Sequence, residues 1–365
     1  MLPRMSIEPS RIDPMDGAIR VGLVGYGLAG AVFHAPLVAS TPGLALVSVV
    51  TADPERRARA RREHPGVRVL GGAEELWSAA GEHDLVVLAT PNTTHLPLGL
   101  AAVAAGLAVV VDKPLALSAA EGRRLLDAAR GRGVPLTVFH NRRWDGDLLT
   151  LRRLLAEGAL GRVRRFESRF ERWRPAARPG AWRERSSPEA GGGVLLDLGS
   201  HLIDQAVLLF GRPGRVYAEV DRRRADVAGD DDVFVALEHP GGVRSHLWAS
   251  AVAAQAGPRL RVLGERGAYV KQGVDVQEAA LRAGRRPTGP GWGGEPRERW
   301  GWLGADGELR PVPTEPGAYQ TFYAELAAAL RGGGRLPVDP EDAVAVLAVL
   351  DAARASARAG TTVTL

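Results

Sequence analysis

The fold is decided by the stretch Ile19-Arg20-Val21-Gly22-Leu23-Val24-Gly25-Tyr26-Gly27-Leu28-Ala29-Gly30. Its first half is a short apolar run, as expected for a strand buried in a parallel sheet. Its second half fits the pattern G-x-G-x-x-G and opens a helix predicted over 28–40. In such a turn the first glycine permits a sharp bend, the second lets a pyrophosphate approach the backbone, and the third lets helix and strand pack closely. A glycine-rich turn without a ligand is the alternative, but the position after the first strand favours a dinucleotide site formed by Gly25, Tyr26, Gly27, Leu28, Ala29 and Gly30.

Strand-like and helix-like segments alternate outward from this stretch. Alternation of this kind predicts right-handed βαβ units and a doubly wound parallel sheet, so we expect a Rossmann dinucleotide-binding domain over 19–139. The preceding 1–18 mix proline, charged residues and serine, which is typical of a flexible N-terminal tail rather than a secretory signal. The predicted strands are 44–50, 67–70, 84–89, 108–111 and 136–139, and the further helices are 55–63, 95–105 and 118–132.

The pattern changes after residue 140. Strand-like runs at 162–173, 215–223, 232–238, 243–250, 259–263 and 268–271 follow one another with few helices between them. Such an order predicts a large, mostly antiparallel open sheet. Helices are predicted over 147–157, 195–210, 319–331 and 341–358. The expected fold class is therefore α/β overall, with an α+β domain over 140–365 after the Rossmann domain.

Composition excludes several classes of function. The chain has 365 residues and no cysteine, which excludes disulfides, thiolate metal sites, iron–sulfur clusters and a catalytic thiol. The absence of cysteine is compatible with a reducing compartment, and we expect a cytoplasmic protein. The formal charge of +5 arises from interspersed acids and bases rather than a one-sided basic stripe, so we expect no nucleic-acid partner. No run approaches the roughly 18 apolar residues of a membrane span.

The end of the second predicted strand bears on the choice between NAD and NADP. A carboxylate at this position would bind the ribose 2′-hydroxyl of NAD, and Asp53 is the candidate. However, Asp53 followed by Pro54 is also the pattern of a helix N-cap with proline at the first helical position. In that interpretation Thr51 and Ala52 occupy the strand tip and leave room for a 2′-phosphate beside Arg56. We favour NADP as the cofactor, with NAD as the alternative.

Three further segments follow predicted parallel strands and should meet at the crevice where ligands bind in such sheets. The segment 90–95 could instead be only a proline-terminated strand before a capped helix. Lys113, in the second segment, could be a solvated lysine. Only two of the 47 basic residues are lysines, at 113 and 271, so a role that requires lysine is favoured for Lys113. Trp144 either lines the crevice or packs at a domain interface. The expected cofactor-contacting residues in the three segments are Thr90, Pro91, Asn92 and His95, then Asp112 and Lys113, then Asn141 and Arg142.

Asp197 and His201 lie four residues apart after three consecutive glycines, within the predicted helix 195–210. On a helix they would share a face, where a carboxylate can orient an imidazole and raise its basicity for proton transfer. The alternatives are a surface ion pair or half of a metal site. No convincing further ligand set appears, so we expect no metal.

Four motifs together resemble the glucose–fructose oxidoreductase / inositol dehydrogenase / MocA (Gfo/Idh/MocA) family. They are GYGLAG at 25–30, TPNTTH at 90–95, DKP at 112–114 and GGGVLLDLGSHLID at 191–204. The family has Glu-Lys-Pro where this chain has Asp-Lys-Pro, which keeps the charge pattern with a shorter acid. The segments 33–36, 138–145, 181–184 and 269–271 look like the NADP-preferring scyllo-inositol dehydrogenase-like branch.

The resemblance implies an NAD(P)-dependent dehydrogenase acting on a secondary alcohol of a cyclic polyol or sugar. It implies Lys113, Asp197 and His201 as the catalytic set, with His201 as proton acceptor, and a C-terminal open sheet that pairs subunits into a homodimer or homotetramer. We expect Lys113 to hold the reacting oxygen and Asp197 to orient His201. Two alternatives use the same fold: glycosidic-bond cleavage through transient oxidation by retained NAD, and sugar sensing without chemistry. The intact catalytic set argues against the second.

Overall fold

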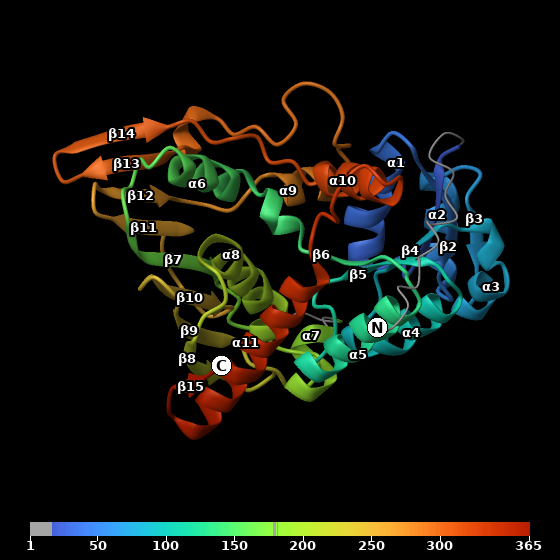
Figure 1. Cartoon of the computed structure of the whole chain (residues 1–365), viewed down its shortest axis with the longest axis horizontal. Coiled ribbons are helices and arrows are strands. Elements are labelled where there is room, and N and C mark those ends of the chain that lie inside the picture. Colours follow the sequence, from blue (N-terminus) through green and yellow to red (C-terminus); the bar gives the residue numbers. More distant parts are fainter. Residues whose placement is uncertain (1–16, 178–179, 181) are drawn as a thin grey trace, which may run out of the picture.

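The computed structural model describes residues 17–177, 180 and 182–365, so nearly all of the expected tail over 1–18 lies outside the described residues. The first sheet has six parallel strands in the order β3-β2-β1-β4-β5-β6 (Figure 1). This is the strand order of the dinucleotide-binding doubly wound fold, so the predicted Rossmann sheet is confirmed. The strands are β1 (Ile19–Val24), β2 (Leu44–Val50), β3 (Arg68–Leu70), β4 (Leu85–Leu88), β5 (Ala108–Asp112) and β6 (Leu136–Phe139).

The first helix begins as a π-helix, η1 (Ala29–His34), and continues as α1 (Ala35–Ser40). Sequence patterning did not predict α3 (Ala73–Ser78), because this short helix has little apolar periodicity. Its start is instead fixed by Glu75, whose carboxylate accepts from the backbone N–H groups of Gly71 and Gly72. The other helices between these strands are α2 (Pro54–Glu63), α4 (His95–Ala104) and α5 (Ala119–Gly131).

The second sheet has nine strands in the order β14-β13-β12-β11-β7-β10-β9-β8-β15. Only β7 and β10 pair in parallel, so the predicted mostly antiparallel sheet is confirmed. The β13–β14 hairpin was not predicted, since its large apolar side chains Trp302 and Leu309 are half-exposed and give no alternating pattern. The strands are β7 (Val163–Glu171), β8 (Arg215–Asp221), β9 (Asp232–Glu238), β10 (Arg244–Ser250), β11 (Leu260–Gly264), β12 (Ala268–Lys271), β13 (Gly301–Ala305), β14 (Glu308–Val312) and β15 (Val363–Thr364).

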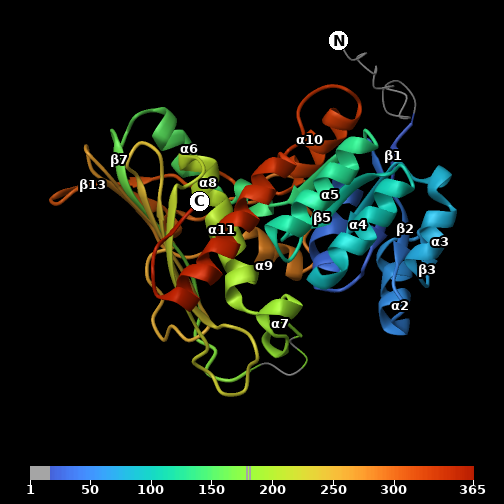
Figure 2. The same ribbon diagram turned by 60° about the horizontal axis from the view of Figure 1, so that its bottom comes forward.

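Three long helices lie on one face of the second sheet: α6 (Gly146–Ala156), α8 (Ser200–Phe210) and α11 (Pro340–Ala359) (Figures 1 and 2). Helix α11 packs against α8 and β8 on one side and against α5 on the other, so one hydrophobic core includes residues of both sheets. Helix α10 (Gln320–Leu330) packs against α1 on the opposite side of the first sheet. The two sheets are thereby held together by the C-terminal helices. No helix in the described part of the chain is both long enough and apolar enough to span a membrane.

Candidate active site

The three glycines of the first turn are required for different reasons. Gly25 has φ +99°, in the left-handed region that favours glycine, and a Cβ at Gly30 would collide with the carbonyl oxygen of Gly25. A Cβ at Gly27 would meet only the Nη1 of Arg56, at 3.7 Å. The fold itself therefore requires Gly25 and Gly30, whereas the space at Gly27 is left open at the start of η1. An open backbone at a helix start is where a pyrophosphate fits.

The other residues of this turn differ in how far they are exposed to a bound cofactor. The side chain of Tyr26 is buried, and its hydroxyl donates to Glu63 Oε2 at 2.8 Å, so only the backbone of Tyr26 faces the turn. Leu28 is 48% exposed at the outer edge of the turn.

Asp53 ends the loop after β2 as the N-cap of α2. Its Oδ1 accepts from the backbone N–H of Arg56 at 3.0 Å, and Pro54 is the first helical residue. The N-cap interpretation of Asp53 is thus confirmed. Thr51 is buried and Ala52 is exposed at the tip, while the half-exposed guanidinium of Arg56 lies beside Gly27.

The loop after β4 is bound to two other loops of the crevice. Asn92 is buried and donates from Nδ2 to the carbonyl oxygen of Gly191 at 3.0 Å. The ring nitrogens of His95 lie 2.8 Å from the carbonyl oxygen of Pro114 and 3.0 Å from that of Thr90. His95 has no exposed surface, so it joins the loops after β4 and β5 instead of contacting the cofactor directly as expected.

Lys113 follows β5 and is bound to Asp197. Its Nζ donates to the main-chain oxygen of Asp197 at 2.5 Å and to Oδ1 of the same residue at 2.8 Å. Arg183 approaches that Oδ1 as well, with Nε at 3.2 Å. Burial acts to raise the pKa of Asp197, but the charges of Lys113 and Arg183 outweigh it and hold this pKa well below its usual value. Asp112, which precedes Lys113 in the chain, pairs with a different residue: its Oδ1 lies 3.5 Å from Nε2 of His34.

The structure does not bear out the expectation that Asp197 orients His201. No hydrogen bond joins these two side chains among the described residues, because the carboxylate is turned toward Lys113 and Arg183. The physical reason is helix register. The segment Leu195–Gly199 is a π-helix, η6, and only from Ser200 does the regular helix α8 begin. The wider turn of a π-helix shifts Asp197 away from the i, i+4 position that an α-helix would give it.

His201 is almost wholly buried on α8, where its ring centroid lies 6.3 Å from that of Phe170 and 6.5 Å from that of His140. Its Nδ1 has no hydrogen-bond partner within the described chain. Burial, and then the positive charges of Lys113 and Arg142, hold the pKa of His201 well below its usual value. The imidazole is therefore neutral near pH 7 and able to accept a proton.

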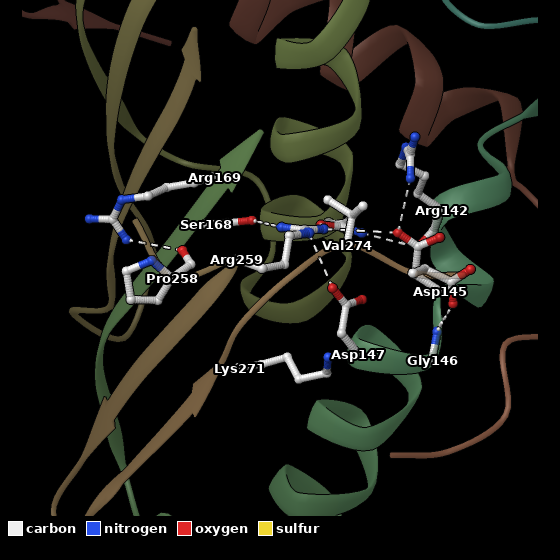
Figure 3. Close-up of polar contacts among 12 residues, drawn as sticks. Arg142, Asp145, Gly146, Asp147, Ser168, Arg169, Pro258, Arg259, Lys271 and Val274 are labelled. Carbon is white, nitrogen blue, oxygen red and sulfur yellow. Dashed lines mark hydrogen bonds and ion pairs between the residues drawn. The ribbon is translucent and has the colours of Figure 1, made fainter. Parts of the chain in front are cut away.

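Two guanidinium groups contact the ring of Phe170, an arrangement that sequence reasoning missed. Arg142 lies 4.6 Å and Arg259 4.1 Å from the ring centroid. Arg259 is buried and approaches Asp147 Oδ2 at 3.1 Å, and Figure 3 shows its guanidinium between Ser168 and Asp147. Phe170 also lies beside His201, with ring centroids 6.3 Å apart. The only sequence signal for this arrangement was the apolar position of Phe170 in an alternating strand.

The residues after β6 serve mainly to join the two halves of the molecule. Arg142 donates from Nη2 to Glu278 Oε2 at 2.8 Å, which sequence patterning could not predict because α9 (Gln277–Arg282) is distant in the chain. Asn141 is buried beside it. Trp144 packs edge-on against Phe322 of α10, with ring centroids 5.7 Å apart, so the interface-packing alternative holds for Trp144.

The described residues contain no group of three or more His, Asp or Glu side chains arranged to hold a metal ion. Two family models match the chain in tandem. The model described as oxidoreductase family, NAD-binding Rossmann fold, matches residues 19–140, and the Gfo/Idh/MocA C-terminal domain matches residues 148–270. The chain belongs to the Gfo/Idh/MocA oxidoreductase family. It is an NAD(P)-binding oxidoreductase, as the motifs predicted.

Individual Gfo/Idh/MocA relatives match over nearly the whole chain. The uncharacterized oxidoreductase YdgJ of Escherichia coli is 40% identical over 94% of this chain and 98% of its own length. The scyllo-inositol 2-dehydrogenase (NADP(+)) IolW of Bacillus subtilis is 35% identical over 95% of this chain and 96% of its own length. The solved structure of yvaA from Bacillus subtilis superposes with a TM-score of 0.90 at 34% identity, covering 96% of this chain and 99% of that one.

Proposed function

We propose that this Gfo/Idh/MocA protein catalyses the reversible oxidation of a secondary alcohol on a cyclic polyol or sugar, with NADP as its preferred cofactor. The main support is the geometry around Lys113. Its ammonium group lies at the C-terminal end of β5 and is bound to ionised Asp197, and its positive charge helps to lower the pKa of the buried His201. Residues 19–139 would bind the cofactor, and residues 140–365 would supply most of the substrate site.

The chain's own groups have separate tasks in this proposal. The nicotinamide, when bound, supplies the hydride acceptor at the crevice. Lys113 uses two of its three N–H groups on Asp197, which leaves one to hold the reacting oxygen and stabilise the negative charge that develops there. His201 accepts the hydroxyl proton. Asp197 positions the ammonium group of Lys113 through these two hydrogen bonds.

The NADP preference rests on the loop after β2. Asp53 is occupied as the N-cap of α2, and Arg56 lies beside the open backbone at Gly27, where it could bind a 2′-phosphate. The relative IolW is named as an NADP(+) enzyme.

An absorbance screen at 340 nm with cyclic polyols and sugars against both cofactors tests the proposal. We expect stoichiometric NADPH formation and a higher kcat/KM with NADP than with NAD. A higher kcat/KM with NAD would mean that Asp53 binds the ribose despite its capping role. Cleavage of a glycoside without net NADPH formation would instead identify the alternative chemistry with retained NAD.

We also propose that the protein forms a homodimer or homotetramer through the second sheet. Helices lie on one face of this sheet, and no part of the described chain covers the other (Figure 2). That face displays Phe234 and Trp248, with ring centroids 5.2 Å apart, and the guanidinium of Arg169 lies 3.9 Å from the Trp248 ring. Aromatic and arginine side chains are enriched at protein interfaces. Light scattering after gel filtration should give two or four times the chain mass, and a monomer would contradict the proposal.

A further inference from the structure

Arg183 adds an unmatched positive charge to the proposed active site. It belongs to the short helix α7 (Trp182–Arg185), and its Nε lies 3.2 Å from Asp197 Oδ1, the same oxygen that Lys113 contacts at 2.8 Å. Because the two cationic nitrogens meet at one oxygen, they are at most about 6 Å apart. Two positive charges therefore share a single carboxylate.

The position of Arg183 is fixed by its backbone and by an aromatic neighbour. Its carbonyl oxygen accepts from Gly193 N–H at 3.1 Å, and the next carbonyl, of Glu184, accepts from Ala228 N–H at 2.8 Å. The guanidinium carbon lies 4.5 Å from the ring centroid of Trp182. The side chain stays 30% exposed, and its two terminal Nη groups make no hydrogen bond to the described residues. Among the described residues, the four N–H donors of these two groups therefore have no acceptor.

The nearby acids are already paired elsewhere. Asp112 is turned toward His34, and Glu278 is bound to Arg142. The positive charge of Arg172 also acts to lower the pKa of Asp197. A planar guanidinium with free N–H groups in an excess of positive charge recognises carboxylates best, because it can bind both oxygens at once.

We propose that Arg183 binds a carboxylate group of the substrate, so that the preferred substrates are polyhydroxy acids such as sugar acids. This inference rests on the proposed dehydrogenase function and makes its substrate class specific. Lys113 would hold the reacting hydroxyl while Arg183 binds the carboxylate, a separation that groups on neighbouring carbons can span. A neutral polyol could occupy the same site but would leave the charge of Arg183 unmatched.

The test is calorimetric titration of the full-length protein loaded with NADPH. The probes are matched pairs of a neutral sugar and its acid: D-glucose with D-glucuronate, and D-galactose with D-galacturonate. We expect the wild-type protein to bind the acid at least tenfold more tightly than the neutral sugar in one pair or both. Arg183→Gln should lose this preference while keeping its affinity for NADPH and its Tm. Arg183→Lys, which keeps the charge without the planar fork, should retain part of it.

Arg185 provides the matched control, since it lies on the same helix α7 but is exposed to solvent. Arg185→Gln removes the same charge from the same helix and should leave the acid preference unchanged. The inference is overturned if the wild-type protein prefers the acid in neither pair, or if Arg183→Gln keeps the preference. Oxidation of neutral polyols without any acid preference would leave the dehydrogenase function standing and refute only this inference. An acid preference that depends on Arg183, without NADPH formation from any compound, would refute the dehydrogenase function alone.

Discussion

Asp197 holds Lys113 in position, whereas sequence reasoning had predicted that the Asp197 carboxylate orients His201. Two N–H groups of Lys113 bind Asp197, so the direction of the third is set by the protein and not by the substrate. A group fixed in this way contributes to catalysis through geometry as much as through charge. At the residue scale, therefore, replacements that keep the charge are the most informative.

We predict that Lys113→Arg lowers kcat by on the order of 100-fold, because a planar fork of different reach displaces the donor by about 1 Å. Tm and cofactor affinity should stay near wild type, since arginine can still pair with Asp197. Steady-state kinetics with calorimetric titration of NADP check this. A wild-type kcat would show that Lys113 serves only as a counter-ion.

Lys271 provides a contrasting control. It is wholly buried on β12, with Nζ 2.9 Å from Glu295 Oε2, so a structural ion pair explains why lysine occurs there. Lys271→Arg should therefore lower Tm but leave the kcat of the folded enzyme within a few-fold of wild type. Loss of kcat in both variants would mean that Lys113→Arg reports general damage.

We predict that His201→Ala lowers kcat by on the order of 10²- to 10⁴-fold, as expected for loss of a positioned proton acceptor. Because the pKa of wild-type His201 is held well below its usual value, kcat/KM for oxidation should stay level as the pH falls through 6.5. A profile that declines with an apparent pKa near 6.5 would contradict the buried, neutral state of this residue.

Sequence patterns predicted that Lys113 and His201 belong to one site, and in the structure the charge of Lys113 acts to lower the pKa of His201. They could not predict the partner of Asp197, which depends on the π-helical register of η6. They also could not single out Arg183 or Phe170. These two residues reach the site only through packing between elements far apart in the chain.

At the scale of elements, the strand–turn–helix unit at the start of the chain was predictable because local backbone geometry requires its glycines. Each short apolar run of the first sheet likewise became a strand within one or two residues of its predicted bounds. The missed elements, α3 and the β13–β14 hairpin, are short and depend on capping or pairing rather than on hydrophobic periodicity. Hydrophobic periodicity thus predicts a helix or strand only where one face of that element is buried.

We predict that Gly27→Val abolishes cofactor binding without unfolding the protein. The first atom of a new side chain meets nothing closer than Arg56 Nη1 at 3.7 Å, but it occupies the space that a pyrophosphate needs. Calorimetric titration with NADP and a thermal melt check both parts. Gly30→Ala is the matched control: its Cβ would collide with the carbonyl of Gly25, so Tm should fall. Near-normal NADP affinity in Gly27→Val would exclude a pyrophosphate at this turn.

At the scale of the whole molecule, α11 ties the two sheets together. Glu341 at its start pairs with Arg123 and Arg130 of α5, with N–O distances of 2.7 and 2.8 Å. Further along, Asp351 accepts from the backbone N–H of Ala119 at 2.8 Å. The two sheets are thus held together by a helix from the far end of the chain, which no local sequence pattern reveals.

The histidines are expected to make the whole molecule sensitive to mild acid. Seven of them, five buried and two partly buried, have a pKa below the usual value, with burial as the largest cause in each. Below pH 6.5 the unfolded chain binds more protons at these sites than the folded one does, so stability is present above pH 6.5 and is lost as the pH falls. The raised pKa of four acids, Asp145, Asp230, Asp275 and Glu325, acts in the opposite direction, but the seven histidines outnumber them. The seven are His64, His83, His95, His140, His201, His239 and His246.

We therefore predict that the free energy of unfolding falls between pH 6.5 and pH 5, by up to about 1.4 kcal/mol per pH unit for each fully buried histidine. Urea titrations at pH 7.5, 6.5 and 5.5 measure the slope. His95 isolates one contribution, because it is wholly buried between two carbonyl oxygens and outside the proposed proton transfer. His95→Gln should lower stability at pH 7.5 but flatten the slope, since glutamine cannot take up the proton. If the variant and the wild type show the same slope, His95 does not gain a proton on unfolding. A wild-type stability that does not fall between pH 6.5 and pH 5 would contradict the prediction for the histidines as a group.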